Sequence, residues 1–188
     1  TCVIQNELGD RMVEAVRRIA TDLGIEAYDE ESHRGILRHI IVRTAFGTND
    51  TMIILVTRTD KLPQQDELVK QLTETYPAIK SIIQNINKEK TNVIMGKKSL
   101  TLFGEDYIYD SIGDLKFKIS PRSFYQVNPT QTKVLYEKTL EYANVDRNDI
   151  VIDAYCGIGT ISLFLAQKAK KVYGVEIVPE AIDDAKIN

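Results

Sequence analysis

The chain has 188 residues, 43% of them hydrophobic, with a formal net charge of −3 at pH 7 and an isoelectric point near 5.5. This acidity gives no global attraction to nucleic acid, so any such binding must come from local basic patches. No apolar run approaches the roughly 18 residues of a membrane span, nothing resembles a signal peptide, and two cysteines cannot form a disulfide framework. We therefore expect a cytoplasmic globular protein with no membrane partner.

The first half of the chain alternates between helical and strand patterns. Apolar side chains spaced three and four residues apart predict two amphipathic helices, and runs of β-branched residues predict three strands. The helices are expected over 6–23 and 64–76, and the strands over 36–46, 51–59 and 78–86. The turn at 47–50 suits an antiparallel hairpin of the first two strands. This order predicts a small α+β layer with the helices on one face of its sheet.

A weaker signal follows, and then a helix with a clear beginning. Short strands are expected at 100–103, 107–109 and 115–119. Asn128 followed by Pro129 predicts a helix start, because the Asn side chain accepts an orphan N–H and proline needs no donor at the first helical position. We expect this helix to reach about residue 143.

The last forty residues read strand, helix, strand, helix. A buried strand is expected over 149–155, a helix over 159–169, a strand over 171–176 and a helix over 179–188. This alternation is the opening of a doubly wound parallel sheet. The predicted fold class is α/β: a small α+β domain over 1–124, then the start of a Rossmann-like domain over 125–188. Because the chain begins without Met and stops within a helix, we expect an excised piece of a longer protein.

The segment VIDAYCGIGT joins a predicted strand to a helix through Gly157 and Gly159. Glycines there let the chain turn sharply and let a ligand approach the backbone. Glu176 ends the next strand, 23 residues after Asp153, where an acid accepts ribose hydroxyls. Ser162 stands where a dinucleotide fingerprint has glycine, which favours a nucleoside without phosphates. The alternative is a turn that serves only tight packing.

Other reactive side chains carry plainer interpretations. We expect Cys156 to be a small side chain packed in the turn rather than a nucleophile. We expect Asp153 to order the turn through hydrogen bonds with the backbone amides of the turn. His33 and His39 lack a partner at metal-binding spacing, so they are expected to be polar strand or surface residues.

Basic residues gather in two stretches. Between 32 and 43 there are three arginines and no acid, and between 80 and 98 there are five lysines and a single acid. An ordinary solvated face is the alternative to RNA binding for such clusters. The candidates for RNA contact are Arg34, Arg38, Arg43, Lys97 and Arg122.

Three segments carry a family resemblance: SPRSFYQVNPTQTKVLY over 120–136, NINKEKTNVIMG over 85–96, and DAYCGIGTISLFLA over 153–166 followed by GVE over 174–176. They resemble the RumA/TrmA-type RNA (uracil-5-)-methyltransferases, closest to the 23S ribosomal RNA branch. The resemblance implies an RNA-modifying enzyme active in rRNA processing. It also implies a Rossmann-like domain that binds S-adenosyl-L-methionine, a central α+β domain and an N-terminal RNA-binding barrel that is absent here.

The resemblance also implies residue roles. The cofactor contacts are expected to be Gln126, Tyr155, Gly157, Gly159, Thr160 and Glu176. The alternatives are a solvent-facing strand residue for Gln126, a core aromatic for Tyr155 and a surface acid for Glu176. In this family a cysteine adds to uracil C6, C5 takes the methyl group and a base removes the C5 proton. The family places that cysteine and base beyond Asn188, so we expect no catalytic residue here and no methyl transfer by this chain alone.

Cys2 resembles the fourth ligand of the 4Fe-4S cluster that many ribosomal members hold. One cysteine cannot hold a cluster, so this role applies only to the full-length enzyme, and a free thiol is the alternative. Three other functions remain open. They are a tRNA uracil-5-methyltransferase, a non-catalytic RNA-binding module, and an NAD-dependent enzyme, which Ser162 disfavours.

Overall fold

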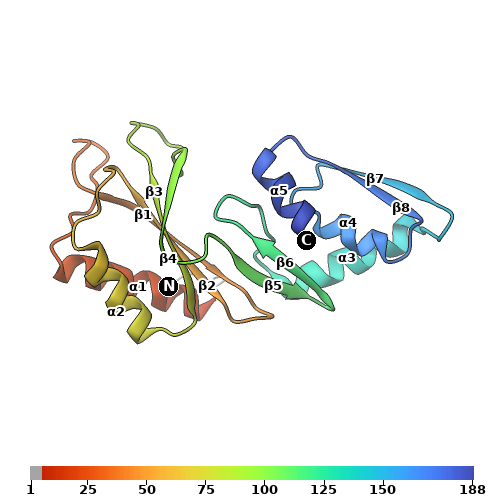
Figure 1. The fold of residues 1–188 in the computed structure, drawn as a ribbon, viewed down its shortest axis with the longest axis horizontal. Coiled ribbons are helices and arrows are strands. Elements are labelled where there is room, and N and C mark those ends of the chain that lie inside the picture. The colour runs from red at the N-terminus through yellow and green to blue at the C-terminus, as the bar shows by residue number, and fades with distance from the viewer. Residues whose placement is uncertain (1–5) are drawn as a thin grey trace. The chain divides into compact units, whose positions relative to one another are not determined.

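The computed structural model describes residues 6–188, so the predicted role of Cys2 falls outside the described residues (Figure 1). Contacts divide the chain into two compact units. The first holds the chain up to Ala45 together with Asn49–Ile108, and the second holds Phe46–Thr48 and Tyr109–Asn188. Over the described residues, no helix has the length and apolar character to cross a membrane.

The first unit is a four-stranded sheet with two helices. In chain order its elements are α1 (Glu7–Asp22), β1 (Leu37–Thr44), β2 (Thr51–Thr57), α2 (Gln65–Thr75), β3 (Ile79–Ile86) and β4 (Lys98–Gly104). The strands lie in the order β1-β2-β3-β4, with β2 and β3 parallel and the outer pairs antiparallel. The predicted helices and strands are confirmed, including the hairpin of the first two strands.

Both helices of this unit cover the same face of the sheet (Figure 1). Met12 and Val16 of α1 and Leu72 of α2 are fully buried against Ile53 and Leu55 of β2. The alternation of side chains along a strand places these two β2 residues on one face. The layer of helices on one side of a sheet, expected from the element order, is therefore confirmed.

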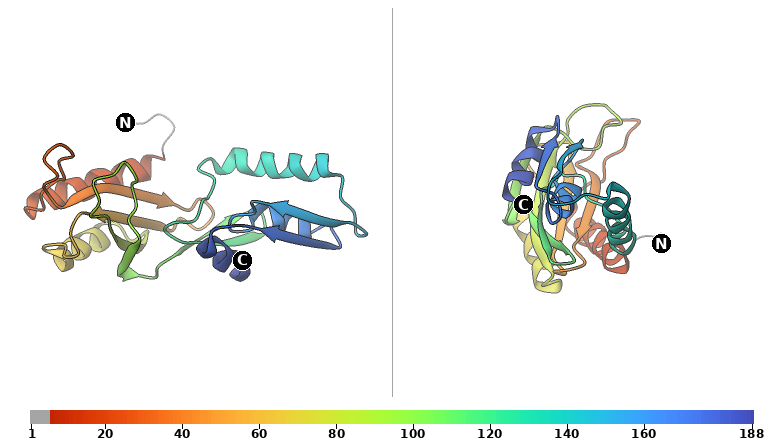
Figure 2. Two further views of the ribbon diagram at one scale, coloured as in Figure 1. Left: turned by 90° about the horizontal axis from the view of Figure 1, so that it is seen from above. Right: turned by 90° about the vertical axis from the view of Figure 1, so that its right-hand side faces the viewer.

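The second unit begins with a hairpin and continues as alternating strands and helices. Its elements are β5 (Ile108–Ile112), β6 (Leu115–Ile119), α3 (Pro129–Ala143), β7 (Ile150–Ala154), α4 (Thr160–Ala166), β8 (Lys171–Val175) and α5 (Pro179–Ile187). β7 and β8 pair in parallel, as the sequence predicted. Figure 2 shows α3 along one side of this pair. The side chain of Asn128 accepts the Gln131 N–H at 3.1 Å, which confirms the predicted start of α3.

The boundary between the units lies near residue 108, whereas the sequence predicted a boundary between 124 and 125. One contact between the hairpin segment and the later segment is made by Asp184 in α5, which is only 2% exposed. Its Oδ2 atom accepts the Ser120 N–H at 3.2 Å, the Ser123 hydroxyl at 2.5 Å and the Ser120 hydroxyl. Lys118 in β6 forms an ion pair with Oδ1 at 3.5 Å. The contacts of one buried carboxylate therefore join residues 118–123 to α5.

The expectation that the strand at 149–155 is buried is wrong, because five of its seven residues are exposed and the other two are only partly buried. Ile150 and Ile152 of β7 are 61% and 69% exposed, and Tyr173 and Val175 of β8 are also exposed. These four residues share one face of the parallel pair, because Ile152 lies opposite Tyr173 in the register. α4 packs against the other face through Ser162 and Asp153. A doubly wound sheet is buried on both faces, whereas helices of residues 6–188 cover only one face here.

We expect Asp184→Asn to lower the free energy of unfolding by about 3 kcal/mol, because it removes the buried carboxylate that pairs with the partly buried Lys118 and accepts the hydroxyl groups of two serines. Urea denaturation of the full-length protein measures the change. Asp183→Asn is the matched control, since Asp183 pairs with Lys186 at 3.8 Å on an exposed surface. The control should stay within about 0.5 kcal/mol of the wild type. Equal effects of the two substitutions would contradict the anchoring role of Asp184.

Candidate cofactor site

The turn between β7 and α4 is built from left-handed backbone. Tyr155, Gly157 and Gly159 have φ angles of 67°, 56° and 82°. A tyrosine rarely adopts this conformation, and here its N–H donates to the Val175 carbonyl at 2.7 Å. The Tyr155 side chain is 88% exposed, and a Cβ built on Gly157 would meet no atom within 4 Å. The backbone at Gly157 is therefore open to an incoming group.

Glu176, directly after β8, is directed at this turn. Its Oε2 atom accepts the Gly157 N–H at 3.1 Å, and Oε1 accepts the N–H groups of Ile177 at 2.7 Å and Val178 at 2.9 Å. The pKa of Glu176 is lowered from its ordinary value of 4.5, with the largest contribution from the Val178 N–H. The structure thus brings the predicted acid and the glycine turn into direct contact.

Asp153 and Ser162 join the strand to the helix behind the turn. The Ser162 hydroxyl donates to Asp153 Oδ2 at 2.6 Å. We expected Asp153 to order the turn through its amides, and the structure shows this hydroxyl contact instead. The carboxylate of Asp153 therefore fixes α4 on β7.

Cys156 packs inside the turn. It is 9% exposed, and its Sγ atom lies 2.8 Å from the position that a Cβ on Gly174 would occupy. Burial raises the pKa of its thiol, which opposes formation of the nucleophilic thiolate. This geometry supports the packing role that the sequence indicated.

Thr160 and Tyr136 form a contact that the sequence analysis missed. The Tyr136 hydroxyl lies 2.9 Å from Thr160 Oγ1, and Tyr136 is 2% exposed. The signal available in the sequence was the spacing of Thr132 and Tyr136, four residues apart, which puts both on one face of α3. The hydroxyl of Thr160, a predicted cofactor contact, is thus engaged by α3.

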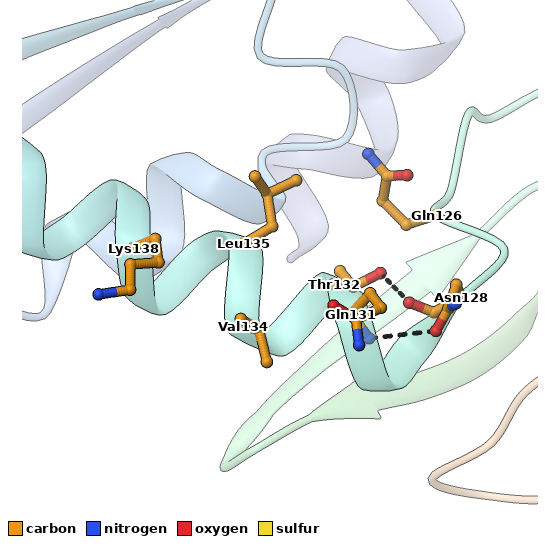
Figure 3. A pocket seen from close by; sticks show the side chains of 7 residues that line it. All are labelled: Gln126, Asn128, Gln131, Thr132, Val134, Leu135 and Lys138. Carbon is orange, nitrogen blue, oxygen red and sulfur yellow. Dashed lines mark hydrogen bonds between the residues drawn. The ribbon is translucent and has the colours of Figure 1, made fainter.

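Gln126 lies at the end of a shallow groove along α3. The groove has a volume of about 420 Å³ and is lined by Gln126, Asn128, Gln131, Thr132, Val134, Leu135 and Lys138. In Figure 3 the Gln126 side chain points away from the first turn of α3. Gln126 is partly exposed, and its side-chain amide has both donor and acceptor groups.

The basic candidates lie in both units. Arg34, Arg38, Arg43 and Lys97 belong to the first unit and Arg122 to the second, and Arg34, Lys97 and Arg122 are exposed. Burial lowers the pKa of Arg43. Whether any of them contacts RNA stays a prediction.

The Arg38 side chain binds backbone carbonyls of the loop that follows β3. Its guanidinium donates to the carbonyls of Asn87 at 2.8 Å, Glu89 at 2.6 Å and Thr91 at 3.2 Å, and it lies 4.5 Å from the ring centre of Tyr28. These bonds hold the lysine-bearing loop after β3.

His33 has a hydrogen-bond partner within the first unit, because the Tyr28 hydroxyl lies 2.6 Å from His33 Nδ1. Residues 6–188 contain no cluster of metal-ligating side chains.

A parallel β-α-β unit with an open glycine turn and an acid facing it from the end of the second strand is typical of the Rossmann-like class of α/β proteins. A family model described as tRNA (uracil-5-)-methyltransferase matches residues 50–188. The chain belongs to this family.

Individual relatives cover the whole chain. An uncharacterized RNA methyltransferase of Oceanobacillus iheyensis is 62% identical over 188 residues, and one of Halalkalibacterium halodurans is 58% identical over 187 residues. The chain spans 41% of the length of each. The solved tRNA (uracil-54, C5)-methyltransferase of Pyrococcus abyssi, in complex with S-adenosyl-L-homocysteine, matches with a TM-score of 0.77 and 25% identity. That match covers 94% of this chain and 41% of the other.

The contacts of Glu176 predict a pH dependence. A carboxylate whose pKa is lowered on folding stabilises the fold above its unfolded pKa, and this stabilisation is lost as the pH falls through the folded pKa. We expect the difference in unfolding free energy between wild type and Glu176→Gln to be largest above pH 4.5 and to shrink below it. Urea denaturation at a series of pH values measures this difference. A difference that does not change with pH would show that the charge of Glu176 is unimportant.

Proposed function

We propose that the protein containing this chain is an S-adenosyl-L-methionine-dependent RNA (uracil-5-)-methyltransferase. The observation that carries the proposal is the 3.1 Å hydrogen bond between the Gly157 N–H and Glu176, which places the acid against open backbone. The family match and the S-adenosyl-L-homocysteine complex of the Pyrococcus abyssi enzyme support it. When bound, the cofactor supplies an electrophilic methyl group.

The acceptor capacity of Glu176 decides how a ribose would bind. A carboxylate offers about four acceptor positions, and backbone N–H groups occupy three of them here. One acceptor position is left for a ribose hydroxyl. Binding both hydroxyls of the ribose requires a second acceptor position on the same carboxylate. The Gly157 bond is the longest of the three and belongs to the open turn. Ribose binding therefore exchanges the Gly157 bond for a hydroxyl, while Ile177 and Val178 keep the carboxylate in place.

The remaining predicted contacts have complementary properties. Tyr155 presents an exposed ring beside the turn, which suits an apolar contact with a ligand. Gly157 and Gly159 give backbone access, and Thr160 begins the helix that follows. Gln126 offers a donor and an acceptor from the segment before α3.

We further propose 23S ribosomal RNA as the substrate, since the motifs over 120–136 and 85–96 resemble the ribosomal branch. The second candidate is tRNA, which is the substrate named for the structurally similar Pyrococcus abyssi enzyme. Either RNA would be bound through local basic residues, because the chain as a whole is acidic.

Glu176→Gln should weaken binding of S-adenosyl-L-homocysteine by about tenfold or more, since an amide offers one acceptor oxygen and no charge. Isothermal titration calorimetry of the full-length protein measures the affinity. Glu180→Gln is the matched control, because it removes an exposed acid four residues away in α5. Its affinity should stay within about twofold of the wild type.

Two outcomes contradict this assignment. A wild type that binds NAD and not S-adenosyl-L-homocysteine makes the protein a dinucleotide enzyme. Equal affinities of wild type and Glu176→Gln for S-adenosyl-L-homocysteine would show that Glu176 does not contact the cofactor.

The RNA substrate is tested with S-adenosyl-L-methionine carrying a labelled methyl group. We expect the full-length protein to form labelled 5-methyluridine in unmodified 23S rRNA, located by mass spectrometry of nuclease digests, and the Glu176→Gln variant to form much less. Label in tRNA alone would assign the protein to the tRNA branch. Cofactor binding without label in either RNA would favour a non-catalytic RNA-binding module.

A further inference from the structure

α3 carries a buried phenol that meets α4 in two ways. The Tyr136 hydroxyl lies 2.9 Å from Thr160 Oγ1, at the first residue of α4. Its ring packs against the ring of Phe164 in an edge-to-face arrangement, with centroids 5.1 Å apart and an interplanar angle of 60°. Polar and apolar contacts therefore fix α3 on the helix that leaves the glycine turn.

The first turn of α3 is fixed close to Gln126. Asn128 caps the helix, and the Thr132 hydroxyl donates to the Asn128 carbonyl at 2.6 Å (Figure 3). Thr132 is 3% exposed and lies one turn before Tyr136 on the same face. Two turns of helix thus connect the segment of Gln126 with Thr160, and both of these residues are predicted cofactor contacts.

The hydroxyl of Tyr136 is not needed to fill space. Phenylalanine would make the same edge contact with Phe164. Thr160 has no side-chain cap before it, since the N-cap of α4 is Gly159. A phenol is protonated at neutral pH and can donate, and burial raises the pKa of Tyr136 further. What the hydroxyl adds is a fixed orientation of the Thr160 side chain.

We propose that Tyr136 is a positioning residue for the cofactor. Through Thr160 it fixes the position of the glycine turn relative to the Gln126 segment. This inference rests on the proposed function. Tyr136 itself does not touch the ligand. Its effect on binding passes through Thr160 and through α3.

The test is a double-mutant cycle of Tyr136→Phe and Thr160→Val in the full-length protein, with calorimetric titration of S-adenosyl-L-homocysteine. We expect each single substitution to weaken binding by about three- to tenfold, which is the range for one lost hydrogen bond. The double variant should lose no more affinity than the single variant with the larger loss, because both substitutions remove the same contact. In steady-state kinetics, the KM for S-adenosyl-L-methionine should rise with little change in kcat.

Two further variants separate positioning from general packing. Thr160→Ser keeps the hydroxyl and should therefore bind S-adenosyl-L-homocysteine more tightly than Thr160→Val. Tyr142→Phe removes a hydroxyl from a 78% exposed tyrosine of the same helix and should leave affinity unchanged.

Specific outcomes overturn the inference. Tyr136→Phe with a lower melting temperature but unchanged affinity and KM would leave the phenol a packing role only. Additive losses in the double variant would show that Tyr136 and Thr160 act separately. A wild type that binds no S-adenosyl-L-homocysteine overturns the proposed function and this inference with it, whereas unchanged affinity in Tyr136→Phe overturns the inference alone.

Discussion

The left-handed backbone between Tyr155 and Gly159 is the constraint on which the second unit depends. Three of its five residues have positive φ, and one of them is a tyrosine, for which this conformation costs about 1 kcal/mol or more. The cost is offset locally, because the N–H groups of Tyr155 and Cys156 both donate to the Val175 carbonyl. The turn thereby stays attached to the end of β8, and the backbone at Gly157 faces open space rather than side chains.

Three carboxylates organise this unit, and their surroundings distinguish their roles. Asp184 is buried, and it joins Lys118 and the segment after β6 to α5. Asp153 accepts the hydroxyl of Ser162 and fixes α4 on the sheet. Glu176 alone among the three is directed at the open turn, and its partners are three backbone N–H groups. The same type of side chain therefore serves two structural contacts and, in the cofactor site that we propose, one binding contact.

The helices and strands could be predicted from the sequence because apolar spacing and the Asn128–Pro129 start are local signals. The glycine turn and its facing acid were predictable from spacing along a known strand-helix-strand pattern. The contact of Tyr136 with Thr160 was not, since it joins side chains 24 residues apart whose orientation depends on packing. The exposure of Ile150 and Ile152 also escaped prediction, because an apolar run does not state which face is covered. Nor does a run of arginines show that Arg38 holds a loop through backbone carbonyls.

The absence of glycine at 162 takes on a different meaning in the structure. In the dinucleotide fingerprint the third glycine allows close packing of helix on strand. Here the strand provides that space, because a Cβ on Gly174 would lie 2.8 Å from Cys156 Sγ and 3.5 Å from Ser162 Oγ. Ser162 is then free to bond Asp153 without pushing α4 away from β8. The serine therefore reflects how the helix is packed, and the choice of a nucleoside over a dinucleotide rests instead on the family match.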